Sequence, residues 1–157
     1  MSNTPAATRV FDDLDAFCAA AGTDLGVGDW FVIDQERINA FADVTEDWQW
    51  IHVDPDLASD GPYGATIAHG YLTLALVPRL GWGIFQVQGV RMQVNYGANK
   101  VRFPHPVTVG SRVRAVATLV STEKTAAGVQ GVIRYTIEIE GQAKPACVAE
   151  TVRLLVP

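Results

Sequence analysis

The segment from Thr66 to Leu80 constrains the fold more than any other, because it is apolar on nearly every side. This pattern predicts a buried helix, since a helix at a protein surface keeps one polar face. The segment is too short to cross a membrane, which takes about 20 apolar residues. We therefore expect the rest of the chain to wrap around a central helix. Its apolar residues are Ile67, Ala68, Leu72, Leu74, Ala75, Leu76 and Val77.

The second half of the chain supplies the expected wrapping. Residues 129–140 alternate between apolar and polar, which predicts a strand with one buried and one wet face. Further strands are expected at 112–120 and 147–156, and in an extended stretch at 87–103 that is interrupted around Gly97. Short turns between neighbouring strands favour antiparallel pairing. The predicted class is α+β, with an antiparallel sheet wrapped around a central buried helix.

The first half carries shorter elements. Residues 11–21 show a helical apolar stripe, and residues 29–33 are typical of a short strand. Asp34 can cap a second helix by accepting the free amide hydrogens of its first turn, and that helix should end near Thr45. Two prolines and two glycines make residues 54–64 a loop with at most one helical turn.

Length and composition fit one domain over residues 1–157, with the first eight residues expected to be flexible. The net charge of −5 argues against a nucleic-acid partner. Neither a membrane helix nor a signal peptide is predicted, so a cytoplasmic protein is expected. Cys18 and Cys147 lack metal-site spacing and are expected to be reduced thiols. No metal and no redox cofactor is predicted, since metal-ligand spacing and a glycine-rich nucleotide loop are both missing.

Asp47 and His52 are the candidate catalytic residues. They lie five residues apart, across a break after a helix, so their side chains can converge. Adding water to an activated double bond requires removal of a proton from water and delivery of a proton to carbon, which a His and a carboxylate can share. Trp48 and Trp50 could exclude bulk water and perturb both pKa values. The alternative is that Asp47 is a turn residue and His52 is structural.

A second motif, residues 63–70, leads into the central helix. Amide hydrogens at a helix start point outward unpaired, so the Gly70 amide could stabilise a thioester oxygen that gains charge. Gly70 also has no side chain to obstruct a substrate. Alternatively, Gly70 only permits close packing, and the neighbouring His69 only satisfies a backbone carbonyl.

These segments resemble the MaoC-like (R)-specific enoyl-CoA hydratases. The shared pattern is a helix, then Asp-x4-His-x-Asp, a loop with glycine, and Ile-Ala-His-Gly opening the central helix. Within this family, the chain resembles in particular the branch of nodulation protein N and its actinobacterial hydratase relatives. The resemblance extends from about Phe11 to the C-terminus. The matching segments are residues 47–55, 95–97, 100–104 and 110–114.

The resemblance implies a hot-dog fold and a homodimer whose sheets join edge to edge, with a substrate tunnel near the dimer interface. It also implies that Asp47 and His52 form the dyad that holds and activates water, and that the Gly70 amide is the oxyanion donor. Some family members have a serine eight residues after that glycine, helping to place the dyad, where this chain has Pro78. Asn95 is the candidate substitute, or alternatively a turn residue before Gly97.

The resulting expectation is reversible hydration of trans-2-enoyl-CoA to (R)-3-hydroxyacyl-CoA, with an acyl-thioester as the substrate. An acyl-CoA thioesterase and a non-catalytic acyl-thioester binding subunit are the alternatives. Tyr71, Trp82 and Phe85 are bulky enough to restrict a substrate tunnel. The basic residues that could meet the CoA phosphates, or else are solvated strand charges, are Lys100, Arg102, Arg112 and Arg114.

Overall fold

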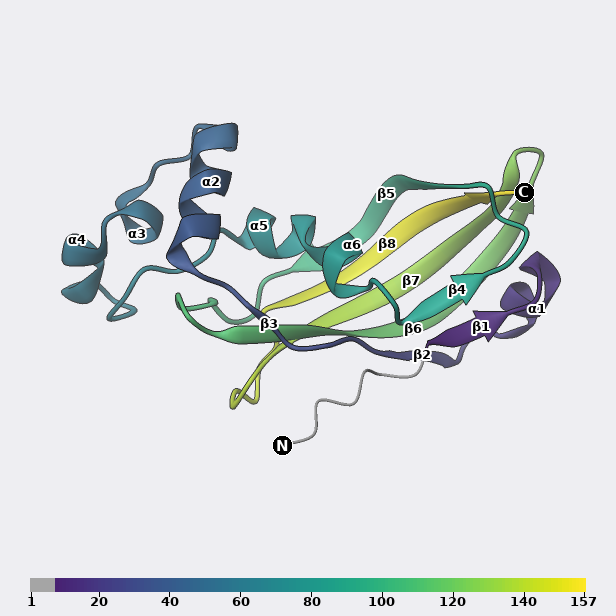
Figure 1. Cartoon of the computed structure of the whole chain (residues 1–157), viewed down its shortest axis with the longest axis horizontal. Helices are drawn as coiled ribbons and strands as arrows, with labels where there is room; N and C mark the ends of the chain where they lie inside the picture. The colour runs from purple at the N-terminus through teal and green to yellow at the C-terminus, as the bar shows by residue number, and fades with distance from the viewer. Residues whose placement is uncertain (1–7) are drawn as a thin grey trace.

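The structure is a computed structural model that describes residues 8–157 (Figure 1). The expected flexibility of the N-terminus concerns residues 1–7, outside the described residues, and Thr8, whose hydroxyl donates to the carbonyl of Gly83 at 2.7 Å. None of the helices within residues 8–157 is long and apolar enough to cross a membrane.

One curved antiparallel sheet forms most of the molecule, in the order β2-β6-β7-β8-β5, with β3 paired to β6. The antiparallel prediction is therefore confirmed. A parallel pair, β1 and β4, was not predicted, because each strand has only three residues. The strands are β1 Arg9–Phe11, β2 Asp24–Val27, β3 Phe31–Val32, β4 Phe85–Val87, β5 Met92–Arg102, β6 Arg112–Thr125, β7 Gly128–Ile139 and β8 Cys147–Val156.

Six short helices accompany the sheet. In Figure 1, α2, α3 and α4 gather at one end of the sheet, whereas α5 and α6 lie over it. Asp34 caps α2 as predicted, accepting from the Arg37 amide at 2.9 Å. The helices are α1 Leu14–Ala19, α2 Gln35–Thr45, α3 Trp50–Val53, α4 Pro55–Ser59, α5 Gly70–Ala75 and α6 Val77–Leu80.

The central helix differs from the prediction at both its start and its middle. It begins at Gly70 rather than Thr66, because Ile67 and Ala68 pair in an extended conformation with Thr108 and Val107. It is divided into α5 and α6 because Pro78 has no amide hydrogen to continue the helical bonding. The hydrophobicity of residues 66–80 indicates that the segment is buried. It does not show whether the residues before the helix are extended or helical.

The core lies between the central helix and the inner face of the sheet. The alternation that predicted strands holds on β6 and β7, whose inward residues are buried. Each buried aliphatic or aromatic side chain stabilises the fold by roughly 1.5–3 kcal/mol. A central helix packed on the inner face of a curved antiparallel sheet is the hot-dog arrangement that the resemblance implied. The buried residues of this interface include Leu72, Leu76, Leu80, Val113, Ala115, Leu119, Ile133, Tyr135, Ile137 and Leu155.

Strand β5 forms one edge of the sheet and is exposed along most of its length. Its pairing with β8 shifts register between Asn95 and Gly97, which is the interruption expected around Gly97. A long edge strand with apolar side chains is a site where another strand can add. Met92, Val94 and Tyr96 are the exposed apolar residues on it.

Candidate active site

Asp47 follows a turn that ends α2. Glu46 adopts a left-handed conformation, with φ of 58°, and thereby reverses the chain after Thr45. The Asp47 amide then donates to the Ala42 carbonyl at 3.1 Å, which fixes the position of its backbone. The Asp47 side chain remains 55% exposed, so its carboxylate is free to meet a ligand.

His52 lies on α3 and is 6% exposed. Its Nδ1 is 2.6 Å from the carbonyl oxygen of Ile67. Because a carbonyl can only accept, Nδ1 carries the proton and Nε2 keeps a lone pair. Burial lowers the pKa of His52 below the usual 6.5, opposed by the Ile67 hydrogen bond. The ring is therefore a neutral base near neutral pH.

His69 joins this pair from the segment before α5. Its ring stacks on that of His52 with centroids 3.8 Å apart, and its Nε2 donates to the backbone carbonyl of Asp47 at 3.0 Å. The Asp47 carboxylate is 4.0 Å from the same nitrogen. The alternative role expected for His69 was to satisfy a local backbone carbonyl; the carbonyl that it binds is instead that of Asp47, 22 residues away. Its Nδ1 is buried and has no partner among residues 8–157.

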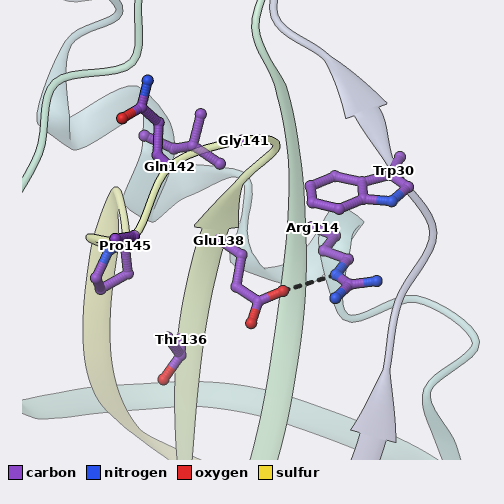
Figure 2. A pocket seen from close by; sticks show the side chains of 9 residues that line it. Trp30, Arg114, Thr136, Glu138, Gly141, Gln142 and Pro145 are labelled. Carbon is purple, nitrogen blue, oxygen red and sulfur yellow. Dashed lines mark hydrogen bonds and ion pairs between the residues drawn. The ribbon is translucent and has the colours of Figure 1, made fainter.

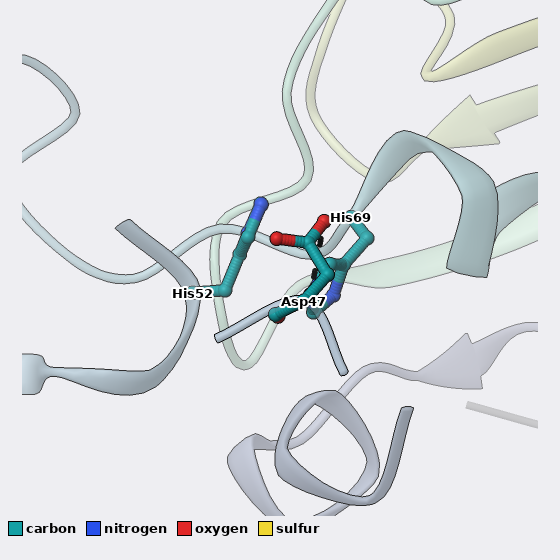
Figure 3. Close-up of side chains that lie close together, drawn as sticks. All are labelled: Asp47, His52 and His69. Atoms are coloured by element: carbon teal, nitrogen blue, oxygen red, sulfur yellow. Dashed lines mark hydrogen bonds and ion pairs between the residues drawn. The ribbon is translucent and has the colours of Figure 1, made fainter. Parts of the chain in front are cut away.

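Asp47, His52 and His69 thus converge from three separate segments (Figure 3). One polar atom from each lies within 4.8 Å of the others. This spacing also suits a metal ion, but one nitrogen of each imidazole is already used on a carbonyl. The remaining free groups are the exposed Asp47 carboxylate, the Nε2 of His52 and the buried Nδ1 of His69. The first two suit a bound water molecule.

Gln35 holds the three segments together and was missed by the sequence reasoning. Its amide nitrogen donates to the carbonyl of His52 at 2.7 Å, and its amide oxygen accepts from the hydroxyl of Thr66. Thr66 is buried. A glutamine in the first turn of a helix gives no sequence signal for such a role, because its partners are distant in the chain.

Gly70 begins α5, and its amide has no hydrogen-bond acceptor in the described part of the chain. A Cβ on Gly70 would meet the ring of Phe103 at 3.1 Å. The structure therefore supports both expected roles of Gly70, an available amide donor and close packing.

The two tryptophans do not shield the dyad within this chain. Trp48 is 56% exposed and donates to Asp43 at 2.9 Å, and Trp50 packs its ring towards Gly61. Burial of the His52 ring lowers its pKa, and the neighbouring His69 lowers it further.

Asn95 lies on β5 and has no hydrogen bond to Asp47 or His52 among the described residues. It lines a hollow of about 650 Å³ between α6, β4 and the inner face of β5 and β8. An adjoining hollow of about 260 Å³ shares Pro78, Asn95 and Arg153 with it. We call the two together the β5–β8 groove. Asn95 therefore lines the same hollows as Pro78, as expected of a substitute, but neither Asp47 nor His52 lines them.

Trp82 and Phe85 line the same groove, whereas Tyr71 is 72% exposed and lies outside it. Trp82 is itself 82% exposed, and the restriction of a tunnel by these residues stays a prediction.

The basic residues considered for CoA phosphates lie elsewhere. Arg112 and Arg114 pair with Glu140 and Glu138 at 2.9 and 2.7 Å. Figure 2 shows Arg114 beside Trp30 in a pocket of about 330 Å³. Their charges are already neutralised, which favours the alternative of structural strand charges. Lys100 and Arg102 lie on the exposed edge strand, without an ion pair among residues 8–157.

Residues 17–141 match the family model for the MaoC like domain. The matched stretch covers most of the chain, including the dyad segment, the central helix and strands β5 to β7. This protein therefore belongs to the MaoC-like family, which confirms the resemblance seen in the sequence.

Among individual relatives, the chain is 55% identical over 145 residues to 3-hydroxyacyl-thioester dehydratase Z of Mycobacterium tuberculosis, covering 92% of this chain and 96% of that protein. It is 39% identical over 137 residues to nodulation protein N of Rhizobium leguminosarum bv. viciae, covering 85% of each. The structure of an (R)-hydratase from A. caviae involved in PHA biosynthesis has the same fold, with a TM-score of 0.68 and 24% identity over 81% of this chain and 91% of that one.

Proposed function

We propose that this protein is an (R)-specific enoyl-thioester hydratase, which adds water reversibly to trans-2-enoyl-CoA and yields (R)-3-hydroxyacyl-CoA. The observation that carries the proposal is the convergence of a neutral His52 with an exposed Asp47 carboxylate. The Gly70 amide, which has no acceptor among residues 8–157, follows His69 of the same cluster. The dehydratase name of a relative 55% identical over nearly the whole chain supports the same chemistry, since dehydration is the reverse reaction.

In the proposed mechanism, a water molecule donates one hydrogen bond to the Asp47 carboxylate and the other to Nε2 of His52. His52 takes the water proton as the oxygen attacks the β-carbon, and the Gly70 amide donates to the thioester oxygen as it gains charge. The imidazolium of His52 then returns the proton to the α-carbon. Since water and proton arrive from the same side, the addition is syn.

The test is hydration of crotonyl-CoA, followed as loss of enoyl absorbance. Asp47→Asn and His52→Gln should each lower kcat by roughly two to four powers of ten, the usual contribution of acid–base catalysis. Both variants should keep the fold, since Asp47 is exposed and Gln can still donate to the Ile67 carbonyl. Retained activity in both would contradict the dyad.

Thiol release without hydroxyacyl product would indicate a thioesterase, and ligand-induced stabilisation without turnover would indicate a binding subunit.

The proposal includes a homodimer in which the exposed β5 edges of two copies pair. Unpaired backbone groups along this edge and the apolar side chains of Met92, Val94 and Tyr96 support this association.

The proposal also includes turnover in the cytoplasm without a metal or a redox cofactor. Hydration moves a proton and a hydroxyl group but no electrons, so one base and one hydrogen-bond donor suffice. Treatment with EDTA should leave kcat unchanged. A loss that Zn²⁺ or Mg²⁺ restores would assign the Asp47, His52 and His69 cluster to a metal instead.

A further inference from the structure

Arg153 occupies a position where the fold predicts an apolar residue. In the register of the sheet, Arg153 pairs with Gly131 on β7 and with Asn95 on β5. On β8 it shares the inward face with Ala149 and Leu155, both buried in the core. Its side chain accordingly lines the β5–β8 groove beneath the central helix. A guanidinium on the inner face of a sheet is costly unless an acceptor satisfies it.

The described residues give Arg153 neutral partners only. Its guanidinium donates to the amide oxygen of Gln93 at 3.2 Å and to the hydroxyl of Tyr135 at 3.3 Å. Both distances are at the long end for hydrogen bonds from a charged donor. Burial raises the pKa of Tyr135, so this hydroxyl brings no negative charge.

The outer face of the same sheet provides the contrast. Arg112, Arg114 and Arg134 each have a carboxylate from the neighbouring strand at 2.6–2.9 Å. Arg153 has none within 4.0 Å in the described chain. Neither hollow of the groove is lined by an Asp, a Glu or a Lys among residues 8–157. The groove therefore carries a single positive charge without a counter-charge.

The groove lies beyond the reacting centre. Pro78, on its wall, follows Gly70 by eight residues, which is about 12 Å along a helix. A group bound at the Pro78 end of the groove is thus about two helical turns from a thioester held at the Gly70 amide. The walls combine apolar Trp82, Phe85 and Leu74 with polar Gln93, Asn95 and Arg153. A purely alkyl tail would displace water from these polar groups and leave Arg153 with neutral partners only.

We propose that the β5–β8 groove receives an acyl tail that ends in a carboxylate, with Arg153 as the residue that selects it. This rests on the proposed hydratase function and names its substrate class. A carboxylate matches the two parallel donors of a guanidinium, and one negative charge balances the one positive charge. The multiply charged phosphates of CoA would call for several cations, and the groove offers one.

The experiment compares two matched substrate series, trans-2-enoyl-CoAs with an alkyl end and those with an ω-carboxylate end, over increasing length. Wild-type protein should show a lower KM for the carboxylate series once the tail is long enough to reach the groove. Arg153→Gln should raise that KM roughly ten- to hundredfold, the value of a charge-assisted contact, with kcat little changed. Crotonyl-CoA, which is too short, should be hydrated as before. Arg153→Lys should recover part of the preference.

Arg134→Gln is the matched control, because it removes an arginine from the outer face of the same sheet. It should leave both series unchanged. Two outcomes would overturn the proposal. One is an equal rise of KM for both series in Arg153→Gln, which a CoA-phosphate contact would produce. The other is the absence of any preference in the wild-type protein. Thermal unfolding of each variant reports whether its fold is retained.

Binding distinguishes this inference from the proposed function. Calorimetric titration with suberoyl-CoA and with octanoyl-CoA measures the preference without turnover. If crotonyl-CoA is not hydrated, the hydratase proposal fails. A tighter suberoyl-CoA complex that weakens in Arg153→Gln still supports a carboxylate site, and equal affinities overturn it.

Discussion

At the scale of single residues, the dyad depends on His52 being neutral. Its Nδ1 proton is held by the Ile67 carbonyl and its ring is buried, which together make Nε2 a base. The spacing of Asp47 and His52 in the sequence indicated that they could meet. Which nitrogen would be free could not be predicted, because it is decided by a backbone carbonyl fifteen residues away.

Lowering the pH should destabilise the protein through His52. Above pH 6.5 the ring is neutral in both the folded and the unfolded chain. Below 6.5 the unfolded chain takes up a proton first, because the folded pKa is lower, so the free energy of unfolding falls until the folded pKa is passed. Urea unfolding at a series of pH values measures this loss. His52→Gln should flatten it, and the control His105→Gln should keep the contribution of His52. An unchanged slope in His52→Gln would contradict the assigned direction.

The two roles of Gly70 can be separated with Phe103. Gly70→Ala retains the amide but places a Cβ at 3.1 Å from the Phe103 ring, so we expect a loss of stability of roughly 1–3 kcal/mol from overpacking. Adding Phe103→Leu should restore the melting temperature. Activity on crotonyl-CoA should remain low, because the methyl group still obstructs the approach of the thioester to the amide. Recovery of full activity in the double variant would show that packing is the only role of Gly70.

At the scale of elements, the site is built where α2, α3 and the entry to α5 meet, and Gln35 connects them. Gln35→Leu should leave the carbonyl of His52 and the hydroxyl of Thr66 without these partners. Each buried unsatisfied group costs about 1–3 kcal/mol. We expect a lower melting temperature and a lower kcat with little change in KM, since the dyad rather than the substrate loses its support. Asn39→Leu removes only the outer partner of Gln35 and serves as the control. Equal effects of the two substitutions would exclude a positioning role for Gln35.

The same elements show what the sequence could predict. Periodicity located β6 and β7, because the buried and wet faces of a strand alternate in sequence, and Asp34 marked the start of α2. Hydrophobicity on all sides placed the predicted start of the central helix four residues early, because Thr66 to His69 are buried yet extended. Gln35 and Arg153 went unnoticed because their roles depend on partners in other segments. Arg153 lies at an inward position of β8. A polar residue at such a position is the signal by which the sequence could have indicated it.

At the scale of the whole molecule, the long edge strand β5 has no partner on its outer side among residues 8–157, and the β5–β8 groove lies beside it. Strand β5 borders the groove through Gln93 and Asn95 and exposes Val94 and Tyr96. Pairing two copies along β5 would cover these apolar side chains and bring each groove close to the other copy. The resemblance implies a substrate tunnel near this interface, so assembly and turnover would be linked.

Breaking the β5 edge should therefore affect both assembly and catalysis. Val94→Pro removes an amide donor and places a residue unsuited to a paired strand on the edge, and Tyr96→Lys adds a charge there. We expect both variants to shift the protein from dimer to monomer in light scattering after gel filtration. Turnover of crotonyl-CoA should fall with the dimer fraction and recover at high protein concentration for Tyr96→Lys. Gln130→Lys, which adds the same charge on the interior strand β7, should remain dimeric. A monomeric wild-type protein with full activity would show that the site is complete in one chain, and that the β5 edge has no part in it.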